Sequence, residues 1–464
     1  MLVRWEYVIL MEIGDDGMNI TVSQAARICG GQLIGEKGHD REIGRVVIDS
    51  RTVAPGDLFV AYKGERVDGH DYIGAALDKG AACCLAERLP EGTTDGVILV
   101  HDVQEALERL CTAYRESLRL PVIGITGSVG KTTVKEMVWA VLSQKLKVLK
   151  TEGNLNNQIG VPMTLSRITP EHQAAVVEMG ISGFGEMRSL ARMAKPTVAV
   201  FTVIGHAHLE FLHDLEGVFR AKTEMLALMP EDGTVIVNGD DPWLSSIKCR
   251  QQVIRCGLHE DCQVRAEDIR LLPEGRTVCD IVYGEKRIHA DIPAYGRHMV
   301  YAAMEAAAVG FTLGLSREEI ERGIANYQVV GRRGAVTMTE TVTLVDDCYN
   351  AHPDSMRCAI DSLRDMPGRH VAILADMLEM GSGGEQMHYD LGRYAVDNGI
   401  SLVLCCGQLG REIAKGAGSR GRWFESTKAL AEALPEQIKK GDIVLVKASR
   451  GMHLEEISEL LKTM

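Results

Sequence analysis

Apolar strands alternate with helical segments along most of the chain. The apolar run Val122–Ile125 is of strand type, turns through glycines, and is followed by Val134–Leu142 with helical periodicity. Such alternation is typical of a mainly parallel sheet that helices cover on both faces. In the same segment the pattern predicts an alanine-rich helix over Gly296–Leu313 and further strands at Ala174–Glu178, Thr197–Val203 and Thr234–Val237.

Two further α/β patterns flank this central segment. Upstream, the pattern predicts helices over Val22–Cys29, Gly69–Lys79 and Glu105–Leu118, with short strands such as Leu58–Ala61 between them. Downstream of Gly331, strands alternate with helices again. The strands are predicted at Thr343–Asp346, Val371–Leu374, Leu402–Cys405 and Ile443–Val446, and the helices include Ser355–Arg364 and Met387–Asp397.

The pattern therefore predicts an α/β protein with three domains. We place a first, smaller domain at residues 18–120, a central parallel-sheet domain at residues 121–330 and a third domain at residues 331–464. Residues 1–17 contain the breaker cluster Gly14–Gly17 and show no regular pattern. We expect them to be an N-terminal extension, or the product of a start codon assigned too early.

Composition narrows the class of protein. Over 464 residues the net charge is −13, and no basic stripe stands out, which argues against nucleic acid as a partner. The 12 cysteines are scattered without Cys-x-x-Cys spacing, so we expect them to be reduced. No apolar run approaches the roughly 18–20 residues that a membrane span needs. The apolar run Val8–Met11 is too short for a signal peptide, and we expect a cytoplasmic protein.

The first central strand ends in a glycine-rich turn that precedes a helix. Backbone amides in such a turn, with the positive end of the helix behind them, can cradle phosphate oxygens. Lys131 would add positive charge at the outer phosphates, and Thr132 a hydroxyl for magnesium. The general motif has a glycine where this chain has Ile125, so the match is to its Gly-Lys-Thr core. We expect a nucleoside triphosphate site, rather than a turn that binds nothing, at Gly127, Ser128, Gly130, Lys131, Thr132 and Thr133.

Polar residues follow the other central strands. Glu178 ends its strand, and its carboxylate could hold a second magnesium, because this hard ion prefers oxygen ligands; otherwise it is a solvated strand end. His208 follows the next strand and would converge with Glu178 at the same edge of the sheet. Lys222 by itself indicates only a solvated helix face. The amide-rich run Asn154–Pro162 could recognise a sugar or a peptide carbonyl, or be only a turn.

Short motifs recur in series around these positions: Asp49–Arg51 with Pro55–Phe59, Gly64–His70, Asn154–Pro162, Glu178–Gly180, Ala207–Glu210, Ala221–Glu224, Asp346–Met356 and Val446–Met452. Together with the phosphate loop, they resemble the Mur ligase family from about residue 18 to the C-terminus. Within the family the chain is most similar to the ligases that add D-alanyl-D-alanine to UDP-N-acetylmuramoyl-tripeptide.

The resemblance implies a fold and an activity. The fold would comprise a UDP-substrate-binding N-terminal domain, a central P-loop domain of ATPase type and a Rossmann-like C-terminal ligase domain. The enzyme would use ATP to activate the carboxylate of UDP-N-acetylmuramoyl-tripeptide as an acyl phosphate, which the amine of D-alanyl-D-alanine attacks. This amide ligation would serve peptidoglycan precursor synthesis. We expect ATP and Mg2+ as cofactors, and a monomer.

The resemblance also implies roles for individual residues. Lys222 would be carbamylated, so that it supports a metal as an anion. Thr132 and Glu178 would hold one Mg2+, and Glu178 and His208 a second. The catalytic residues would be Lys131, Glu178, His208 and Lys222. Nucleotide contacts from the C-terminal domain would come from Asp347, Asn350 and either Arg332 or Arg333, and contacts to the UDP substrate from Ser50, Arg51, Asn154 and Asn157.

The chain departs from the family pattern near the expected nucleotide. Met299 and Ala302 stand where the family has two asparagines, so we expect weaker contacts to adenine. His352 also replaces an asparagine, and His206 stands where an acidic residue is common. Two alternatives remain open: a related ligase with another amine or acceptor, and a non-catalytic paralogue that binds nucleotide or a UDP-sugar. The intact set of candidate catalytic residues favours an enzyme.

Overall fold

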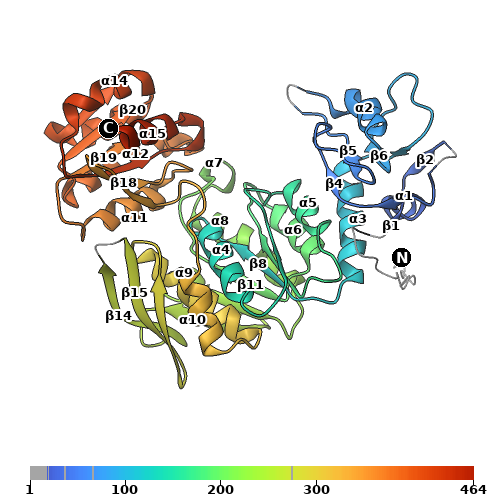
Figure 1. Ribbon diagram of the computed structural model, residues 1–464, viewed down its shortest axis with the longest axis horizontal. Helices are drawn as coiled ribbons and strands as arrows, with labels where there is room; N and C mark the ends of the chain where they lie inside the picture. Colours follow the sequence, from blue (N-terminus) through green and yellow to red (C-terminus); the bar gives the residue numbers. More distant parts are fainter. Residues whose placement is uncertain (1–17, 19, 36–37, 65–66, 273–274) are drawn as a thin grey trace.

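The computed structural model describes residues 18, 20–35, 38–64, 67–272 and 275–464, so the predicted extension at 1–17 lies outside the described residues. Figure 1 shows three α/β units in chain order, with the central unit between the other two. Their sheets lie within residues 32–99, 122–292 and 335–447. The α/β prediction is confirmed. The three domain limits stay a prediction, because the sheets do not fix where each domain ends.

The N-terminal unit contains a five-stranded sheet in the order β2-β7-β6-β5-β4, in which β2 is the antiparallel edge, and a two-stranded ribbon of β1 and β3. Helix α1 starts at a capping box, because the Thr21 hydroxyl accepts the Gln24 N–H and the Gln24 side chain accepts the Thr21 N–H. The elements are β1 (Ile20–Thr21), α1 (Val22–Cys29), β2 (Gln32–Ile34), β3 (Glu42–Ile43), β4 (Val46–Val47), β5 (Leu58–Val60), α2 (Ile73–Asp78), β6 (Cys83–Ala86), β7 (Val97–Leu99) and α3 (Val103–Ser117).

The central unit is built on a nine-stranded sheet in the order β16-β15-β14-β13-β12-β11-β8-β10-β9. Neighbours from β9 to β14 are parallel, as predicted, whereas β14, β15 and β16 form antiparallel hairpins that the sequence pattern did not predict. The elements are β8 (Val122–Thr126), α4 (Lys131–Leu142), β9 (Val148–Lys150), α5 (Gly160–Leu165), β10 (Ala174–Glu178), α6 (Glu186–Ala194), β11 (Val198–Phe201), α7 (Leu209–Leu212), α8 (Leu215–Thr223), β12 (Thr234–Asn238), β13 (Gln252–Gly257), β14 (Val264–Leu272), β15 (Arg276–Tyr283), β16 (Lys286–Ile292), α9 (His298–Thr312) and α10 (Arg317–Ala325).

The C-terminal unit contains a six-stranded sheet in the order β17-β18-β22-β19-β20-β21, parallel except for the edge strand β17. Its elements are β17 (Ala335–Met338), β18 (Val342–Asp346), α11 (Pro353–Leu363), β19 (His370–Leu374), α12 (Gly384–Asp397), β20 (Leu402–Cys406), α13 (Gly410–Gly416), β21 (Gly421–Phe424), α14 (Thr427–Gln437), β22 (Asp442–Lys447) and α15 (Glu455–Thr463). Within the described part of the chain, no helix is long and apolar enough to span a membrane.

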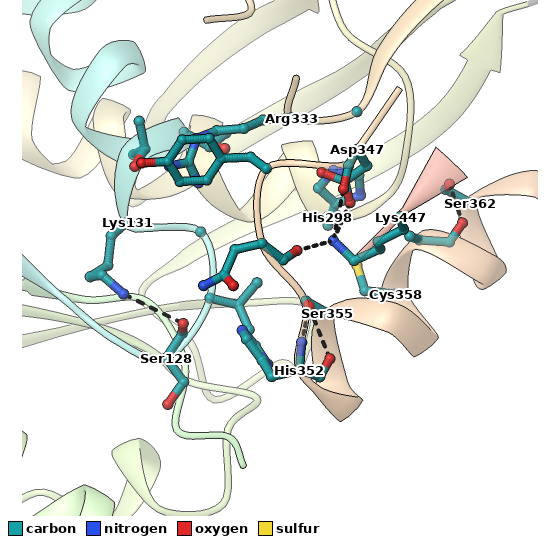
Figure 2. Close-up of a pocket in the computed structure, with 18 of the residues that line it drawn as sticks. Ser128, Lys131, His298, Arg333, Asp347, His352, Ser355, Cys358, Ser362 and Lys447 are labelled. Atoms are coloured by element: carbon teal, nitrogen blue, oxygen red, sulfur yellow. Dashed lines mark hydrogen bonds and ion pairs between the residues drawn. The ribbon is translucent and has the colours of Figure 1, made fainter. Parts of the chain in front are cut away.

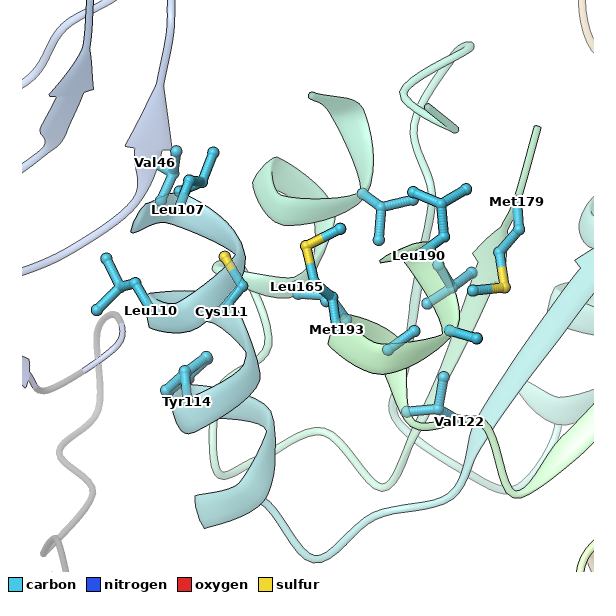
Figure 3. Close-up of a cluster of buried hydrophobic side chains, with 14 of the residues drawn as sticks. Val46, Leu107, Leu110, Cys111, Tyr114, Val122, Leu165, Met179, Leu190 and Met193 are labelled. Atoms are coloured by element: carbon cyan, nitrogen blue, oxygen red, sulfur yellow. The ribbon is translucent and has the colours of Figure 1, made fainter. Parts of the chain in front are cut away.

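One apolar cluster joins the N-terminal and central units. Leu107, Leu110 and Cys111 of α3 are fully buried in it, beside Leu165 of α5 and Leu190 of α6 (Figure 3). Burying one leucine side chain is worth about 1.5–3 kcal/mol. A continuous face of such side chains therefore fixes the N-terminal unit to the central sheet.

Polar pairs join the central and C-terminal units. In the loop after β11, His206 Nδ1 lies 3.0 Å from Asp354 Oδ2, and His208 Nδ1 lies 2.8 Å from Glu379 Oε2. The backbone N–H of His206 also donates to Asp354 Oδ2, at a donor–acceptor distance of 2.5 Å. The side chains of His206 and Asp354 remain 37% and 30% exposed. This interface is therefore polar and reached by solvent.

Candidate active site

A cleft of about 1120 Å³, open solvent included, lies between the central and C-terminal units. Figure 2 shows side chains from both units around it. The central unit contributes Ser128–Thr133, Asn156, Glu178, Tyr295 and His298. The C-terminal unit contributes Arg333, Gly334, Val336, Val345, Asp347, Tyr349, Asn350, His352, Ser355, Cys358, Ala359, Ser362 and Lys447.

The predicted phosphate loop connects β8 to α4 at one wall of this cleft. Gly127 has a φ of 152°, and a Cβ there would lie 2.0 Å from Thr202 Oγ1, so the tight turn requires glycine. Lys131 Nζ donates to the carbonyl oxygens of Gly127 at 2.8 Å and Ser128 at 3.4 Å. Burial lowers the pKa of Lys131, and the charge of Glu178 opposes this. The predicted strand–turn–helix context is confirmed, and its lysine lies over the loop.

Glu178 meets the loop at the end of the neighbouring strand. It is 2% exposed, and its carboxylate accepts hydrogen bonds from Thr132 Oγ1 at 3.0 Å and from Asn156 Nδ2 at 2.7 Å. Lys135 Nζ lies 3.5 Å from the same carboxylate. The structure therefore places Glu178 beside Thr132, as we expected from the sequence. We predicted no contact of Glu178 with Asn156 or Lys135.

The pair of Glu178 and Thr132 offers oxygen atoms of the kind that Mg2+ prefers. The carboxylate is buried beside the loop that would carry the phosphates, so its donor set fits the ion. His208 uses its Nδ1 for Glu379. Among the described residues, no group of three or more histidine, cysteine, aspartate or glutamate side chains is arranged as a metal site. A metal here would therefore rely on the hydroxyl and on substrate oxygens as well.

Three basic side chains lie close together beside the loop. Burial lowers the pKa of His208, Glu379 opposes this, and the charges of Lys222 and Lys131 lower it further. Lys222 is 1% exposed on α8, and burial together with Lys131 holds its pKa well below the usual range. Glu224, the acidic neighbour of Lys222 in sequence, instead accepts the backbone N–H of Gly185 at 3.1 Å. The charge of Lys131 acts on both His208 and Lys222, so the three side chains lie near one another. The expected convergence of His208 with Glu178 stays a prediction.

The structure brings Arg333, not Arg332, to the cleft. Arg332 forms ion pairs with Asp346 at 2.7 Å and Glu459 at 2.6 Å. Arg333 lines the cleft with its guanidinium 3.8 Å from the centre of the Tyr349 ring. The prediction of Arg332 is corrected in this respect, because the carboxylates of β18 and α15 hold that side chain away from the cleft.

The predicted residues Asp347 and Asn350 both line the cleft, where Lys447 connects them. Lys447 Nζ lies 2.5 Å from Asp347 Oδ2 and donates to the Asn350 carbonyl oxygen at 3.0 Å (Figure 2). Lys447 is 3% exposed at the end of β22. Lys447 belongs to the motif Val446–Met452, but we predicted no role for it. Its position became clear only from the fold, because β22 pairs with β18 in the sheet.

The four predicted substrate residues do not line this cleft. Ser50 and Arg51 lie in the N-terminal unit, where Arg51 pairs with Asp49 at 2.7 Å and its side chain is 87% exposed. Asn157 accepts the backbone N–H of Gly160 at 2.9 Å and so stabilises its own turn. In the amide-rich run, Asn156 rather than Asn154 or Asn157 reaches Glu178. Their role in substrate binding stays a prediction.

Both departures on α9 lie in the same environment. His298 lines the cleft, whereas Met299 and Ala302 are 4% and 3% exposed in the apolar cluster beneath α9. Side chains at those two positions therefore pack in the core and do not line the cleft. His352 lines the cleft with its Nδ1 unpaired among the described residues.

Family models match each of the three units. The model described as "Mur ligase family, catalytic domain" matches residues 42–115, the one described as "Mur ligase middle domain" matches residues 125–310, and the one described as "Mur ligase, glutamate ligase domain" matches residues 331–450. Together these matches cover well over half of the chain.

Relatives match the chain over nearly its whole length. Two proteins named UDP-N-acetylmuramoyl-tripeptide–D-alanyl-D-alanine ligase are similar to it. The one from Bacillus subtilis is 37% identical, with 94% of this chain and 97% of the relative covered, and the one from Escherichia coli is 36% identical, with 96% and 99% covered. A crystal structure of MurF from Acinetobacter baumannii has a TM-score of 0.88 at 31% identity, covering 97% of this chain and 100% of that one. The MurF ligase of Thermotoga maritima in complex with ADP has a TM-score of 0.82 at 30% identity, covering 90% and 97%. The chain belongs to the Mur ligase family and has its three-domain architecture.

Proposed function

We propose that the chain is an ATP-dependent ligase that joins D-alanyl-D-alanine to UDP-N-acetylmuramoyl-tripeptide in peptidoglycan precursor synthesis. Full-length relatives that carry this name support the proposal, as does the ADP complex of the Thermotoga maritima relative. The observation that carries it is the cleft itself. A phosphate loop with Lys131 and the buried Glu178 face residues of a second domain there.

These residues suit phosphoryl and acyl transfer. The substrate carboxylate attacks the γ-phosphorus of ATP, ADP leaves, and the acyl phosphate that results is attacked by the amine while inorganic phosphate leaves. The loop amides and Lys131 offset the negative charge of the phosphates, which is the largest demand of phosphoryl transfer. Arg333, Asn350 and Lys447 add groups from the C-terminal domain on the other side of the cleft.

Thr132 and Glu178 would hold a Mg2+ ion, with His208 beside them. The buried carboxylate and the hydroxyl suit a hard ion that prefers oxygen ligands. When bound, the ion supplies further charge neutralisation at the phosphates. Glu178 would then exchange its hydrogen bond from Thr132 for a metal contact, while Asn156 Nδ2 continues to orient the carboxylate.

Lys222 would carry a carbamate. Its environment favours the uncharged amine, because burial and Lys131 disfavour the ammonium form. An uncharged amine can add to carbon dioxide with loss of one proton, which converts the lysine into an anion. Lys222→Ala should then lose most of its activity and regain part of it with added acetate or formate. The control Lys415→Ala, on an exposed helix surface, should keep the natural activity, with or without these carboxylates. If acetate restores no activity, the carbamate is ruled out.

The remaining assignments complete the proposal. The N-terminal domain, residues 18–120, would bind the UDP substrate through Ser50 and Arg51, with Asn154 and Asn157 nearby in the central domain, residues 121–330. Residues 331–464 would form the ligase domain, and the enzyme would act as a monomer.

A coupled assay tests the function directly. Purified protein is mixed with ATP, Mg2+ and UDP-N-acetylmuramoyl-tripeptide, and each of a panel of amines is added while phosphate release and product mass are measured. We expect product formation with D-alanyl-D-alanine well above that with single amino acids. Product with another amine only would assign a different ligase, and tight substrate binding without phosphate release would assign a non-catalytic protein.

A further inference from the structure

Lys135 brings a buried positive charge to the carboxylate that would hold Mg2+. It lies on α4, one turn after Lys131, and is 1% exposed. Its Nζ lies 3.1 Å from Glu136 Oε1 and 3.5 Å from Glu178 Oε2. A lysine is almost never fully buried unless it is paired with an acid. Lys135 is therefore held between two carboxylates, one of which belongs to the candidate active site.

The two oxygens of Glu178 have different neighbours. Asn156 Nδ2 donates to Oε1 at 2.7 Å, whereas Lys135 Nζ lies beside Oε2. Lys135 Nζ also donates to the carbonyl oxygen of Gly153 at 3.5 Å, in the turn that leads to Asn156. The hydroxyl of Thr132 lies within 3.2 Å of Oε1 and 3.0 Å of Oε2. The ammonium group thus acts on one oxygen of the same carboxylate that the hydroxyl and the amide contact.

The charges around Glu178 balance one another. Lys150 Nζ pairs with Glu136 Oε2 and lies 3.7 Å from the centre of the Trp139 ring. With Lys135, the two lysines carry two positive charges, and Glu136 and Glu178 carry two negative ones. This group of four side chains, which we call the charge quartet, is therefore neutral. A divalent cation bound beside it without an anion would leave an uncompensated charge in a buried region, which is costly.

We infer that Lys135 is a positioning residue that opposes the binding of free Mg2+ at Glu178 and so restricts this site to Mg2+ bound together with a nucleotide. The inference rests on the proposed Mg2+ site. The phosphates of a nucleotide supply the negative charge that the neutral quartet lacks. The ammonium of Lys135 repels a cation at its partner carboxylate, because like charges at this separation repel strongly where water is largely excluded. Metal binding thereby becomes coupled to nucleotide binding.

Lys150 provides a matched control within the same quartet. It has the same charge as Lys135, but its Nζ contacts Glu136 and not Glu178. Lys150→Met and Lys135→Met therefore remove the same charge and add the same side chain. If Lys135 acts through its contact with Glu178, the two substitutions have different effects on metal binding. If only the net charge of the quartet matters, they have the same effect.

Manganese titrations of matched variants test this inference. Mn2+ also binds carboxylates, and its electron paramagnetic resonance signal falls when it binds to the protein. The dissociation constant is measured without nucleotide and with the non-hydrolysable ATP analogue AMP-PNP. Without nucleotide, we expect Lys135→Met to bind Mn2+ about tenfold more tightly than the natural protein, and Lys150→Met to stay within about twofold. Addition of Glu178→Gln to Lys135→Met should abolish the gain, which distinguishes this site from carboxylates on the surface.

Several outcomes would overturn the inference. They are unchanged or weaker Mn2+ binding by Lys135→Met, an equal gain in Lys150→Met, and a gain that survives Glu178→Gln. A natural protein that binds Mn2+ equally well with and without AMP-PNP also overturns it. If Lys135→Met does not fold, Glu136→Gln is compared with the double variant Lys135→Met/Glu136→Gln, in which the remaining charges balance. Tighter Mn2+ binding by the double variant is expected, and equal binding overturns the inference.

The ligase assay is independent of these titrations, because they need neither the UDP-linked substrate nor the amine. A protein in which Lys135→Met gains Mn2+ affinity through Glu178 but which forms no product would retain this inference and lose the proposed function. An active ligase without that gain would retain the proposed function and lose the inference.

Discussion

The two interfaces of the central domain differ in kind. Toward the N-terminal domain, α3 packs on α5 and α6 through buried side chains of one continuous apolar cluster. Toward the C-terminal domain, the contacts are polar pairs such as His206–Asp354 and His208–Glu379, around a cleft. Separating the first interface exposes apolar surface at a cost of about 25 cal/mol per Å², whereas exposed ion pairs contribute about 0–1 kcal/mol each. The first interface therefore fixes two domains together, and the second can open and close on a ligand.

The two interfaces also differ in how their charged side chains are placed. At the first interface, the buried guanidinium of Arg115 donates to the carbonyl oxygens of Ala194, Leu118 and Leu120 at 2.9–3.0 Å. These hydrogen bonds direct the guanidinium to carbonyl oxygens within the protein. At the second, burial and the charge of Lys131 lower the pKa of Lys222, and Lys131 and Glu178 line a cleft that is open to solvent. The second interface therefore places charged groups where a ligand can reach them.

The largest expected effect is on catalysis at the second interface. Lys131→Ala and Glu178→Ala should each reduce turnover by about a hundredfold or more while the protein stays folded, because each removes electrostatic stabilisation that the transition state needs. Phosphate release with all substrates measures this. A variant that keeps more than about a tenth of the natural rate, a loss below about 1.4 kcal/mol of barrier, would remove that residue from its proposed role. Lys415→Ala serves as the surface control.

The next effect is on stability at the first interface. Leu107→Ala leaves a cavity in the apolar cluster that joins the two domains, since Leu107 is fully buried. We expect a loss of about 2–5 kcal/mol in the free energy of unfolding, measured with urea. The matched control Leu258→Ala removes the same atoms at a position that is 44% exposed and should cost far less. Equal losses at the two positions would show that the apolar interface does not hold the domains together.

A buried acid on α9 of the central domain allows a pH-dependent test of burial. Glu305 of α9 is 1% exposed, neither carboxylate oxygen has a partner in the described structure, and burial raises its pKa well above the usual range. Above its ordinary pKa the unfolded chain has lost this proton and the folded chain still holds it, so stability falls as the pH rises. Glu305→Gln should remove this fall, which is at most about 1.4 kcal/mol per pH unit. Denaturation from about pH 5 to pH 8 measures it, with the exposed Glu436→Gln as control; parallel curves for the natural and variant proteins would contradict the account.

The smallest effect on stability is expected at the ion pair between the central and C-terminal domains. His206→Ala, Asp354→Ala and the double variant form a cycle whose coupling energy should be at most about 1 kcal/mol, because both side chains are about a third exposed. The apparent affinity for ATP should nevertheless weaken a few-fold, since the pair helps to close the cleft. A coupling energy above about 3 kcal/mol would make this interface as firm as the apolar one.

The sequence pattern located most elements of the parallel sheets. The strand Ala174–Glu178 was predicted with its observed ends, because its apolar run is bounded by a polar residue on each side. Strands β14 to β16 were missed. Charged and polar residues interrupt their apolar residues, so no continuous apolar run indicates them.

The site was predictable only where one short segment determines it. The phosphate loop and Glu178 follow directly from strand ends, and their contact through Thr132 was expected. Arg333, Lys447 and His352 reach the cleft only because the C-terminal domain docks on the loop after β11. Which of two adjacent arginines enters the cleft depends on the ion pairs of Arg332, and no local pattern contains that information.

Hydrogen exchange tests the contrast between the two interfaces most directly. The natural protein is compared by mass spectrometry with and without AMP-PNP, Mg2+ and the UDP-linked tripeptide. We predict that residues 204–214 and 347–356, at the polar interface, gain protection with the ligands, while residues 103–117 and 186–194, at the apolar interface, exchange slowly in both states. Rapid exchange of residues 103–117, or a ligand-dependent change there as large as that at residues 204–214, would contradict the account.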